Sequence, residues 1–202
     1  MTSKILALAL LLAWTASPSA AQSKTFTIFD PEGGYELFLS GINDAGHAVG
    51  MSRRVPGEER GLLAAGRVLT DYQYPGLVQT YFNGINNRGL IVGRAISFSG
   101  GLPTYIPFTF QNGAFIPLPP LPPGFAPYGA YGVNDAGDIV GIARNSQGIN
   151  FAGFLLKNGS YTLIQVPGAS STFALGVNQD TVVGYFDPAG SDTSTGFLLR
   201  NG

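Results

Sequence analysis

The side chains that could do chemistry in this chain are few and far apart. His47 is the only histidine and cysteine is absent, so neither a zinc cluster nor a Cys–His catalytic pair can be assembled. Glu58 and Glu59 could act as carboxylates in glycoside hydrolysis, but the sequence does not place any two carboxylates at a working distance. The sequence therefore predicts no catalytic residue and no cofactor.

Calcium is a metal that two short segments suggest. Asp44 and Asp135 each follow an asparagine inside a recurring Asn-x-x-Gly pattern, and calcium needs roughly six to eight oxygen ligands at one point. Asn87 and Gln179 stand at the matching positions of the other two copies, which removes the charge from half of them. Turn formation explains these residues without a metal, so no metal ligand is predicted.

A glycine-rich phrase recurs four times and organises the chain. Its copies are GINDAGHAVG at 41–50, GINNRGLIVG at 84–93, GVNDAGDIVG at 132–141 and the shorter GVNQDTVVG at 176–184. Successive copies start 43, 48 and 44 residues apart. A period of this size indicates stacked or radially arranged supersecondary units.

Each repeat contains four short apolar segments, here named a, b, c and d in chain order. Segment a ends at a Pro/Gly turn, b ends at the asparagine of the phrase, c begins in its Val-Gly end, and d leads to a glycine. The segments are rich in Val, Ile, Phe, Tyr and Leu, and their boundaries carry turn residues. No helical period follows residue 21, so we predict an all-β fold with four repeats of four short antiparallel strands.

Turn lengths predict how these strands are connected. The b–c and d–a turns carry Asn-x-x-Gly, Asn-Gly or a lone Gly, which are typical of tight hairpins. The c–d links are long, so we expect d, a, b and c to form one meander and the c–d link to cross to the next. This wiring predicts a propeller-like ring closed by the two termini, in which strand Gly196–Arg200 completes a blade that begins with strand Lys24–Asp30. An open β-solenoid of the same repeats is the alternative.

The first 21 residues have the features of a secretory signal peptide. Lys4 precedes an apolar run from Ile5 to Trp14, and small residues end at Ala21. We expect cleavage there, which leaves a single domain over residues 22–202 that is secreted, periplasmic or extracellular, with no membrane insertion. The chain has 11 basic and 12 acidic residues, and this balance does not favour nucleic-acid binding.

The order of Phe-Leu, Pro-Gly and Gly-[Ile/Val]-Asn-x-x-Gly-x-x-Val-Gly resembles the HAF-type extracellular repeat proteins of bacteria. The resemblance extends over the chain after residue 21, in four in-phase copies. The His-Ala-Phe tripeptide of that family is absent, and Ala152–Phe154 and Thr195–Phe197 stand in two of its places. The resemblance implies an exported repeat protein and brings no catalytic residues with it.

The a–b and c–d links are expected to share one face, because successive links of a meander alternate between its two ends. We name this the loop face. Its links vary in length and content, as binding loops of repeat arrays do, and their aromatic and polar side chains suit stacking on sugars or contact with a protein. The candidate binding residues there are Arg53, Arg54, Glu58, Glu59, Tyr72, Tyr74, Phe98, Tyr105, Phe125, Tyr128 and Asn145.

Together these features favour a secreted, non-enzymatic repeat protein that binds an envelope component, a polysaccharide or another protein. Two other hypotheses stay open. One is a secreted polysaccharide hydrolase or lyase that uses loop carboxylates such as Glu58 and Glu59. The other is a purely structural surface protein.

Overall fold

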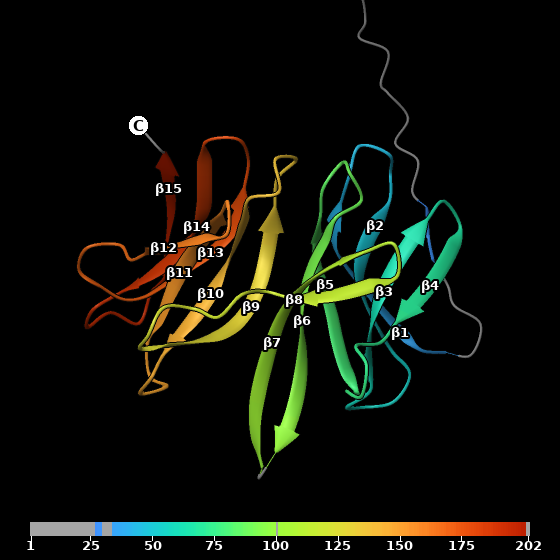
Figure 1. Cartoon of the computed structure of the whole chain (residues 1–202), viewed down its shortest axis with the longest axis horizontal. Coiled ribbons are helices and arrows are strands. Elements are labelled where there is room, and N and C mark those ends of the chain that lie inside the picture. The colour runs from blue at the N-terminus through green and yellow to red at the C-terminus, as the bar shows by residue number, and fades with distance from the viewer. Residues whose placement is uncertain (1–26, 30–33, 100, 201–202) are drawn as a thin grey trace, which may run out of the picture.

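The computed structural model describes residues 27–29, 34–99 and 101–200. Within these ranges every regular element is a strand, and the strands form four antiparallel sheets. The sheets follow one another in chain order as the blades of a four-bladed propeller, which confirms the predicted all-β repeat fold (Figure 1). No helix in this described part of the chain is long and apolar enough to cross a bilayer.

Each blade is an up-and-down meander of strands that are consecutive in the chain. Blade 1 contains β1 (Glu36–Ile42), β2 (Ala48–Arg53), β3 (Glu59–Ala65) and β4 (Val68–Tyr72). Blade 2 contains β5 (Gln79–Ile85), β6 (Ile91–Ser99), β7 (Leu102–Gln111) and β8 (Ala114–Pro117). Blade 3 contains β9 (Phe125–Val133), β10 (Ile139–Asn145), β11 (Phe151–Lys157) and β12 (Ser160–Ile164). Blade 4 contains β13 (Ala169–Val177), β14 (Thr181–Pro188) and β15 (Thr195–Arg200).

The predicted connection between blades is wrong. Segments c and d pair within one blade, as β2 with β3 and β6 with β7. The chain crosses to the next blade along the a–b links at 73–78, 118–124 and 165–168. Most of the stretch Ser97–Tyr105, which we expected to be a crossing link, belongs to the paired strands of a long hairpin. Each blade therefore runs in the order b, c, d, a.

Close packing of the b strands explains why the phrase begins and ends with glycine. A Cβ on Gly84, the first glycine of the second phrase, would lie 2.7 Å from the carbonyl oxygen of Tyr131 in the next blade. A Cβ on Gly93, the last glycine of that phrase, would lie 2.0 Å from the carbonyl oxygen of Tyr81, beside a bulge in β5. Both positions therefore need a residue without a side chain.

Apolar side chains fill the space between consecutive blades. Phe82 of blade 2 packs in one cluster with Val49 of blade 1, and Phe154 of blade 3 packs in a second with Val92 of blade 2. A third cluster between blades 3 and 4 contains Val140. The three valines occupy the same position of the phrase and are all 0% exposed. The repeat thus rebuilds the same interface at each step.

The fourth blade differs from the others. Val183, at the valine position of the last phrase, is 43% exposed, and Leu198 on β15 is 56% exposed. β15 pairs with β14 in its own blade, whereas β1 and β2, which the predicted wiring placed in the same sheet as β15, form blade 1 with β3 and β4. Of the predicted strand Lys24–Asp30 the structure describes residues 27–29, and these lie in no strand. The predicted signal peptide lies outside the described residues.

Candidate functional site

The meanders give the propeller two unlike faces. The b–c and d–a turns lie on one face, which we name the turn face, and the a–b links and c–d hairpins lie on the other. In blade 3, for example, the amide of Ser146 in the c–d hairpin donates to the carbonyl of Gly124 in the a–b link at 2.9 Å. The grouping of links predicted for the loop face is therefore correct, although the crossing link is a different one.

A ladder of asparagine side chains joins the blades on the turn face. The Nδ2 of Asn43 donates to the backbone carbonyl of Asn86 at 3.1 Å. Asn86 donates in the same way to Asn134 at 2.9 Å, and Asn134 to Asn178 at 2.8 Å. Each bond links one phrase to the next, so the invariant asparagine of the phrase has a structural role in this chain.

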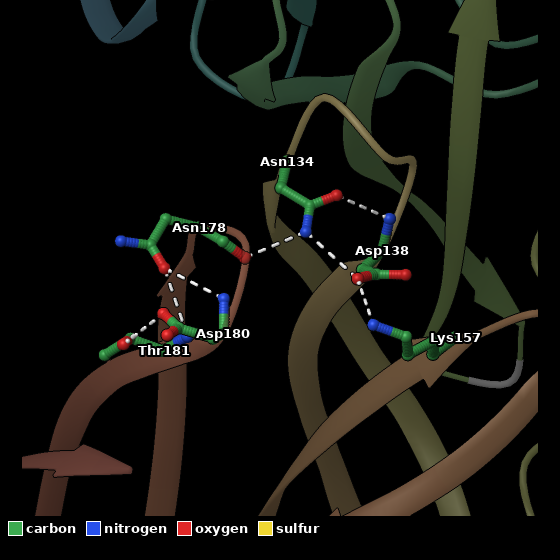
Figure 2. Close-up of polar contacts among 6 residues, drawn as sticks. All are labelled: Asn134, Asp138, Lys157, Asn178, Asp180 and Thr181. Carbon is green, nitrogen blue, oxygen red and sulfur yellow. Dashed lines mark hydrogen bonds and ion pairs between the residues drawn. The ribbon is translucent and has the colours of Figure 1, made fainter. Parts of the chain in front are cut away.

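Figure 2 shows the last step of the asparagine ladder. The Oδ1 of Asn134 accepts the backbone amide of Asp138 at 2.8 Å, which holds the turn, while its Nδ2 reaches the carbonyl of Asn178. The Asp138 carboxylate also accepts from Nζ of Lys157 at 3.0 Å, so its charge is paired beside the ladder. The polar groups here hold turns together and are already occupied.

A polar cavity of about 260 Å³ lies where the b–c turns of all four repeats meet. At its rim, Nδ2 of Asn87 donates to Asp44 at 2.8 Å and to Asp135 at 2.9 Å. The two carboxylates that suggested calcium are thus bridged by an amide. Among the described residues, no group of three or more His, Cys, Asp and Glu side chains is placed to hold a metal ion. The loop face is the stronger candidate for a site.

A continuous row of aromatic rings crosses blades 2 to 4 toward the loop face. Successive ring centroids are 4.5, 5.3, 5.4 and 4.5 Å apart, which is contact distance for aromatic pairs. All five side chains are partly or largely exposed. The row therefore presents partly exposed aromatic side chains to solvent across three blades. Its members, from blade 2 to blade 4, are Tyr105, Tyr128, Phe151, Phe173 and Tyr185.

Arg94 on β6 lies against the blade 2 end of this row. Its guanidinium carbon is 4.9 Å from the ring centroid of Tyr128 and 5.7 Å from that of Tyr105. The rings of Tyr81 and Tyr131 are 5.2 and 5.9 Å away, and Nη1 donates to the Tyr131 hydroxyl at 2.9 Å. Each ring attracts the cation through its quadrupole. No carboxylate within the described ranges forms an ion pair with Arg94.

The tyrosines beside Arg94 are held in their neutral form. Burial raises the pKa of Tyr131 to about 12, although the positive charge of Arg94 opposes the shift. Burial also raises the pKa of Tyr81, and the negative charge of Glu59 adds to this effect. Both phenols stay protonated at neutral pH, so they can donate and accept hydrogen bonds but are poorly suited to remove a proton.

Several predicted loop-face residues do come together. Tyr105 and Tyr128 are neighbours in the aromatic row. Arg53 pairs with Glu36 at 3.0 Å and with Glu59 at 3.2 Å, so one cation is shared by two carboxylates. This second group lies on blade 1, outside the row.

Four other predicted residues have structural roles. Tyr72 and Tyr74 pack against the aromatic core between blades 1 and 2, and Phe125 packs against the core between blades 2 and 3. They lie there because the a–b links cross from blade to blade over these interfaces. The Oδ1 of Asn145 accepts the amides of Ile149 and Asn150 within its own hairpin.

The remaining predicted residues are exposed or paired on their own. Nη2 of Arg54 pairs with Asp71 at 3.0 Å. Phe98 is 58% exposed near the tip of the β6–β7 hairpin. Glu58 is exposed, whereas Glu59 is buried and paired with Arg53, so the two adjacent carboxylates lie in different environments.

Sequence reasoning missed Arg94 and its partners Tyr81 and Tyr131, because these residues lie inside strands and the search was confined to links. Three members of the aromatic row were missed for the same reason. A signal was present, since aligning the four phrases places Arg94 directly after the last glycine of the second copy. The other three copies have an apolar or aromatic residue there.

No protein-family model matches this chain, and no curated protein matches it in sequence. The resemblance to HAF-type repeat proteins therefore stays a prediction. Any function must be argued from the geometry of the loop face.

Proposed function

We propose that this chain is an exported, non-enzymatic protein that binds a polysaccharide along its loop face. The observation that carries the proposal is the aromatic row from Tyr105 to Tyr185, with its rings in contact across three blades. Aromatic rings stack on the C–H faces of sugars, and the hydroxyls of the three tyrosines in the row can also bond to sugar hydroxyls. A row of such rings suits several consecutive units of one chain.

The state of the loop-face acids and phenols favours binding over catalysis. Glu59 is buried and paired with Arg53, so its carboxylate is engaged. A glycosidase needs two carboxyl groups facing the scissile bond, and Glu58 and Glu59 do not share an environment. The raised pKa of Tyr81 and Tyr131 makes both phenols weak candidates for a general base.

Export rests on the sequence. Residues 1–21 have the composition of a signal peptide, and the phrases resemble exported HAF-type repeats. Polysaccharides of the envelope or of the surroundings are ligands that such a protein would meet.

The test is a binding assay with residues 22–202 on a panel of immobilised polysaccharides, neutral and acidic. Tyr105→Ala and Tyr185→Ala each remove a ring from the row, and Phe98→Ala removes an exposed ring outside it. We expect each row variant to lower affinity about three- to tenfold and Phe98→Ala to leave it unchanged. Melting temperatures confirm that the variants fold.

The proposal fails if no polysaccharide is retained, or if the row variants bind as tightly as the parent chain. Retention of a protein but of no glycan would move the function to protein recognition. Concentration-dependent self-association without glycan binding would favour a structural surface protein.

A further inference from the structure

We propose further that Arg94 is the subsite for a carboxylate group of the bound glycan, so the ligand is an acidic polysaccharide that contains uronic acid units. The inference rests on the proposed function and names its substrate class. It is carried by the charge environment of Arg94, by a comparison of the four repeats, and by the position of Arg94 beside the aromatic row.

The first observation is an unpaired positive charge. Arg53 and Arg54, at the loop-face end of blade 1, each contact at least one carboxylate at 3.0 Å. Within the described ranges Arg94 contacts none, and its Nε is buried without a hydrogen-bond partner. The cation–π contacts offset part of the free-energy cost of burying this charge, but they satisfy none of its N–H groups. The hydrogen bond from Nη1 to the Tyr131 hydroxyl satisfies one of them.

The second observation is that the fold does not need an arginine at this position. Arg94 directly follows the last glycine of its phrase, where the other copies carry Met51, Ile142 and Tyr185. All four residues lie in the c strand of a blade with the same register to its neighbours. Three blades therefore form with an uncharged side chain at this position. Packing alone does not explain why blade 2 has a charged one.

The third observation is the geometry around the guanidinium. Arg94 is partly exposed, and two of the rings against it, Tyr105 and Tyr128, begin the aromatic row. The Tyr131 hydroxyl accepts from Nη1 and keeps its own proton to donate. A sugar ring stacked on the row would therefore place a carboxylate on its edge next to a guanidinium fork and a phenol donor. That combination suits a planar, two-oxygen anion.

The test compares one polymer with and without its carboxylates. Polygalacturonate and its carboxyl-reduced form have the same linkages, so their affinities for residues 22–202 differ only through the acid group. Arg94→Met inserts the residue that blade 1 carries at this position, and Arg94→Lys keeps the charge without the fork. Arg88→Met, on the turn face, is the matched control for loss of one positive charge.

We expect the parent chain to bind polygalacturonate at least about tenfold more tightly than the reduced polymer, the size of effect that one charge-assisted pair gives. Arg94→Met should lose this preference and keep the affinity for the reduced polymer. Arg94→Lys should keep part of it, and Arg88→Met all of it. Circular dichroism and melting curves check that each variant is folded.

Four results would overturn the inference. Equal binding of both polymers by the parent chain shows that no carboxylate is recognised. A full preference in Arg94→Met shows that another group supplies the recognition. Retention of neutral glycans alone sinks the carboxylate subsite and leaves the proposed polysaccharide binding intact, whereas retention of no glycan at all sinks both.

Discussion

The last glycine of each phrase shows how a single residue sets the shape of a blade. Gly50, Gly93, Gly141 and Gly184 lie where a Cβ would meet a carbonyl oxygen of the neighbouring b strand at 1.8 to 2.3 Å. No side-chain rotation relieves such a contact, because the Cβ has no freedom of its own. The bulged b strand can therefore approach the c strand this closely only because the c strand has a glycine at this position.

Gly93→Ala should consequently destabilise the fold. The backbone around Tyr81 must shift to admit the methyl group, and forced overpacking of this kind costs about 1–3 kcal/mol or more. Gly196→Ala is the control, because the nearest atom to a Cβ there is 3.8 Å away. Urea unfolding of both variants measures the difference, and equal midpoints would contradict this account of the phrase.

The buried tyrosines predict a loss of stability at high pH. Burial raises the pKa of both Tyr131 and Tyr161 to about 12, above the ordinary value of 10.0, because the charged phenolate is poorly solvated there. The folded chain thus holds these protons more tightly than the unfolded chain. Their contribution is complete below pH 10 and is lost as the pH rises toward 12.

Absorbance at 295 nm should accordingly show some of the nine tyrosines ionising late, together with a falling melting temperature between pH 10 and 12. The double variant Tyr131→Phe, Tyr161→Phe should flatten that fall. Ionisation of every tyrosine in one step near pH 10, with the fold intact, would argue against the buried environment of these two rings.

At the scale of elements, the asparagine ladder connects turns that are 43 to 48 residues apart in sequence. The side chains of Asn86 and Asn178 each accept backbone amides of their own turn. Of these two, Asn86 alone also donates to a following turn within the described part of the chain. Comparing the two separates the turn function from the ladder function.

Asn86→Ala should therefore cost more stability than Asn178→Ala. Asn86 is 4% exposed, and its loss removes the side-chain donor to the carbonyl of Asn134, which then accepts only the backbone amide of Gly137. We expect a difference of about 1–3 kcal/mol in the free energy of unfolding, as for other buried hydrogen-bond partners. Chemical denaturation gives both values, and equal losses would show that the cross-turn bonds contribute nothing.

The strands themselves could be predicted from the sequence, whereas their grouping into blades could not. Apolar segments bounded by Gly, Pro and Asn gave the strands, and Asn112 and Asn158 at positive φ confirm the tight d–a turns. The sequence predicts a crossing link around Phe98 because the stretch Ser97–Tyr105 is much longer than the tight b–c and d–a turns. In the fold those residues extend a hairpin, and link length alone does not distinguish a loop from a projecting pair of strands.

The candidate site was harder to predict for a related reason. Tyr72, Tyr74 and Phe125 lie in or directly beside the a–b links, where aromatic binding residues were expected, yet they pack into the cores between blades. Arg94 and Tyr131 lie within strands, and their neighbours come from separate repeats. The order of the strands decides which face of each strand packs against the next blade. An error in the predicted order therefore assigns core side chains to the binding site.

At the scale of the whole molecule, blade 4 has three described strands where the others have four. The corrected strand order b, c, d, a leaves one segment to complete it. Lys24–Phe29 ends as many residues before β1 as β4 ends before β5, and residues 25–28 alternate between polar and apolar. The expectation from the sequence that this segment shares a blade with β15, and so closes the ring, stays a prediction.

Deleting residues 22–29 should then lower the melting temperature by about 5–10 °C and leave β15 as an open edge that promotes self-association. Deleting residues 22 and 23 alone is the control. Ile28 is 84% exposed in the structure. If the segment is equally exposed in solution, the longer deletion will not change the melting temperature. Differential scanning calorimetry with size-exclusion chromatography separates the two outcomes.

The ladder of asparagines also bears on how such a chain can change its length in evolution. Each rung has the same donor and the same acceptor, one phrase apart, so a duplicated repeat brings its own rung and preserves those on either side. The fourth phrase is one residue shorter after its asparagine and still receives its rung at 2.8 Å, so a rung depends on the position of the asparagine and not on the length of the turn that follows it. Copying or removing a whole repeat would therefore preserve the pattern of rungs, and the ladder itself sets no limit on the number of phrases that it can join.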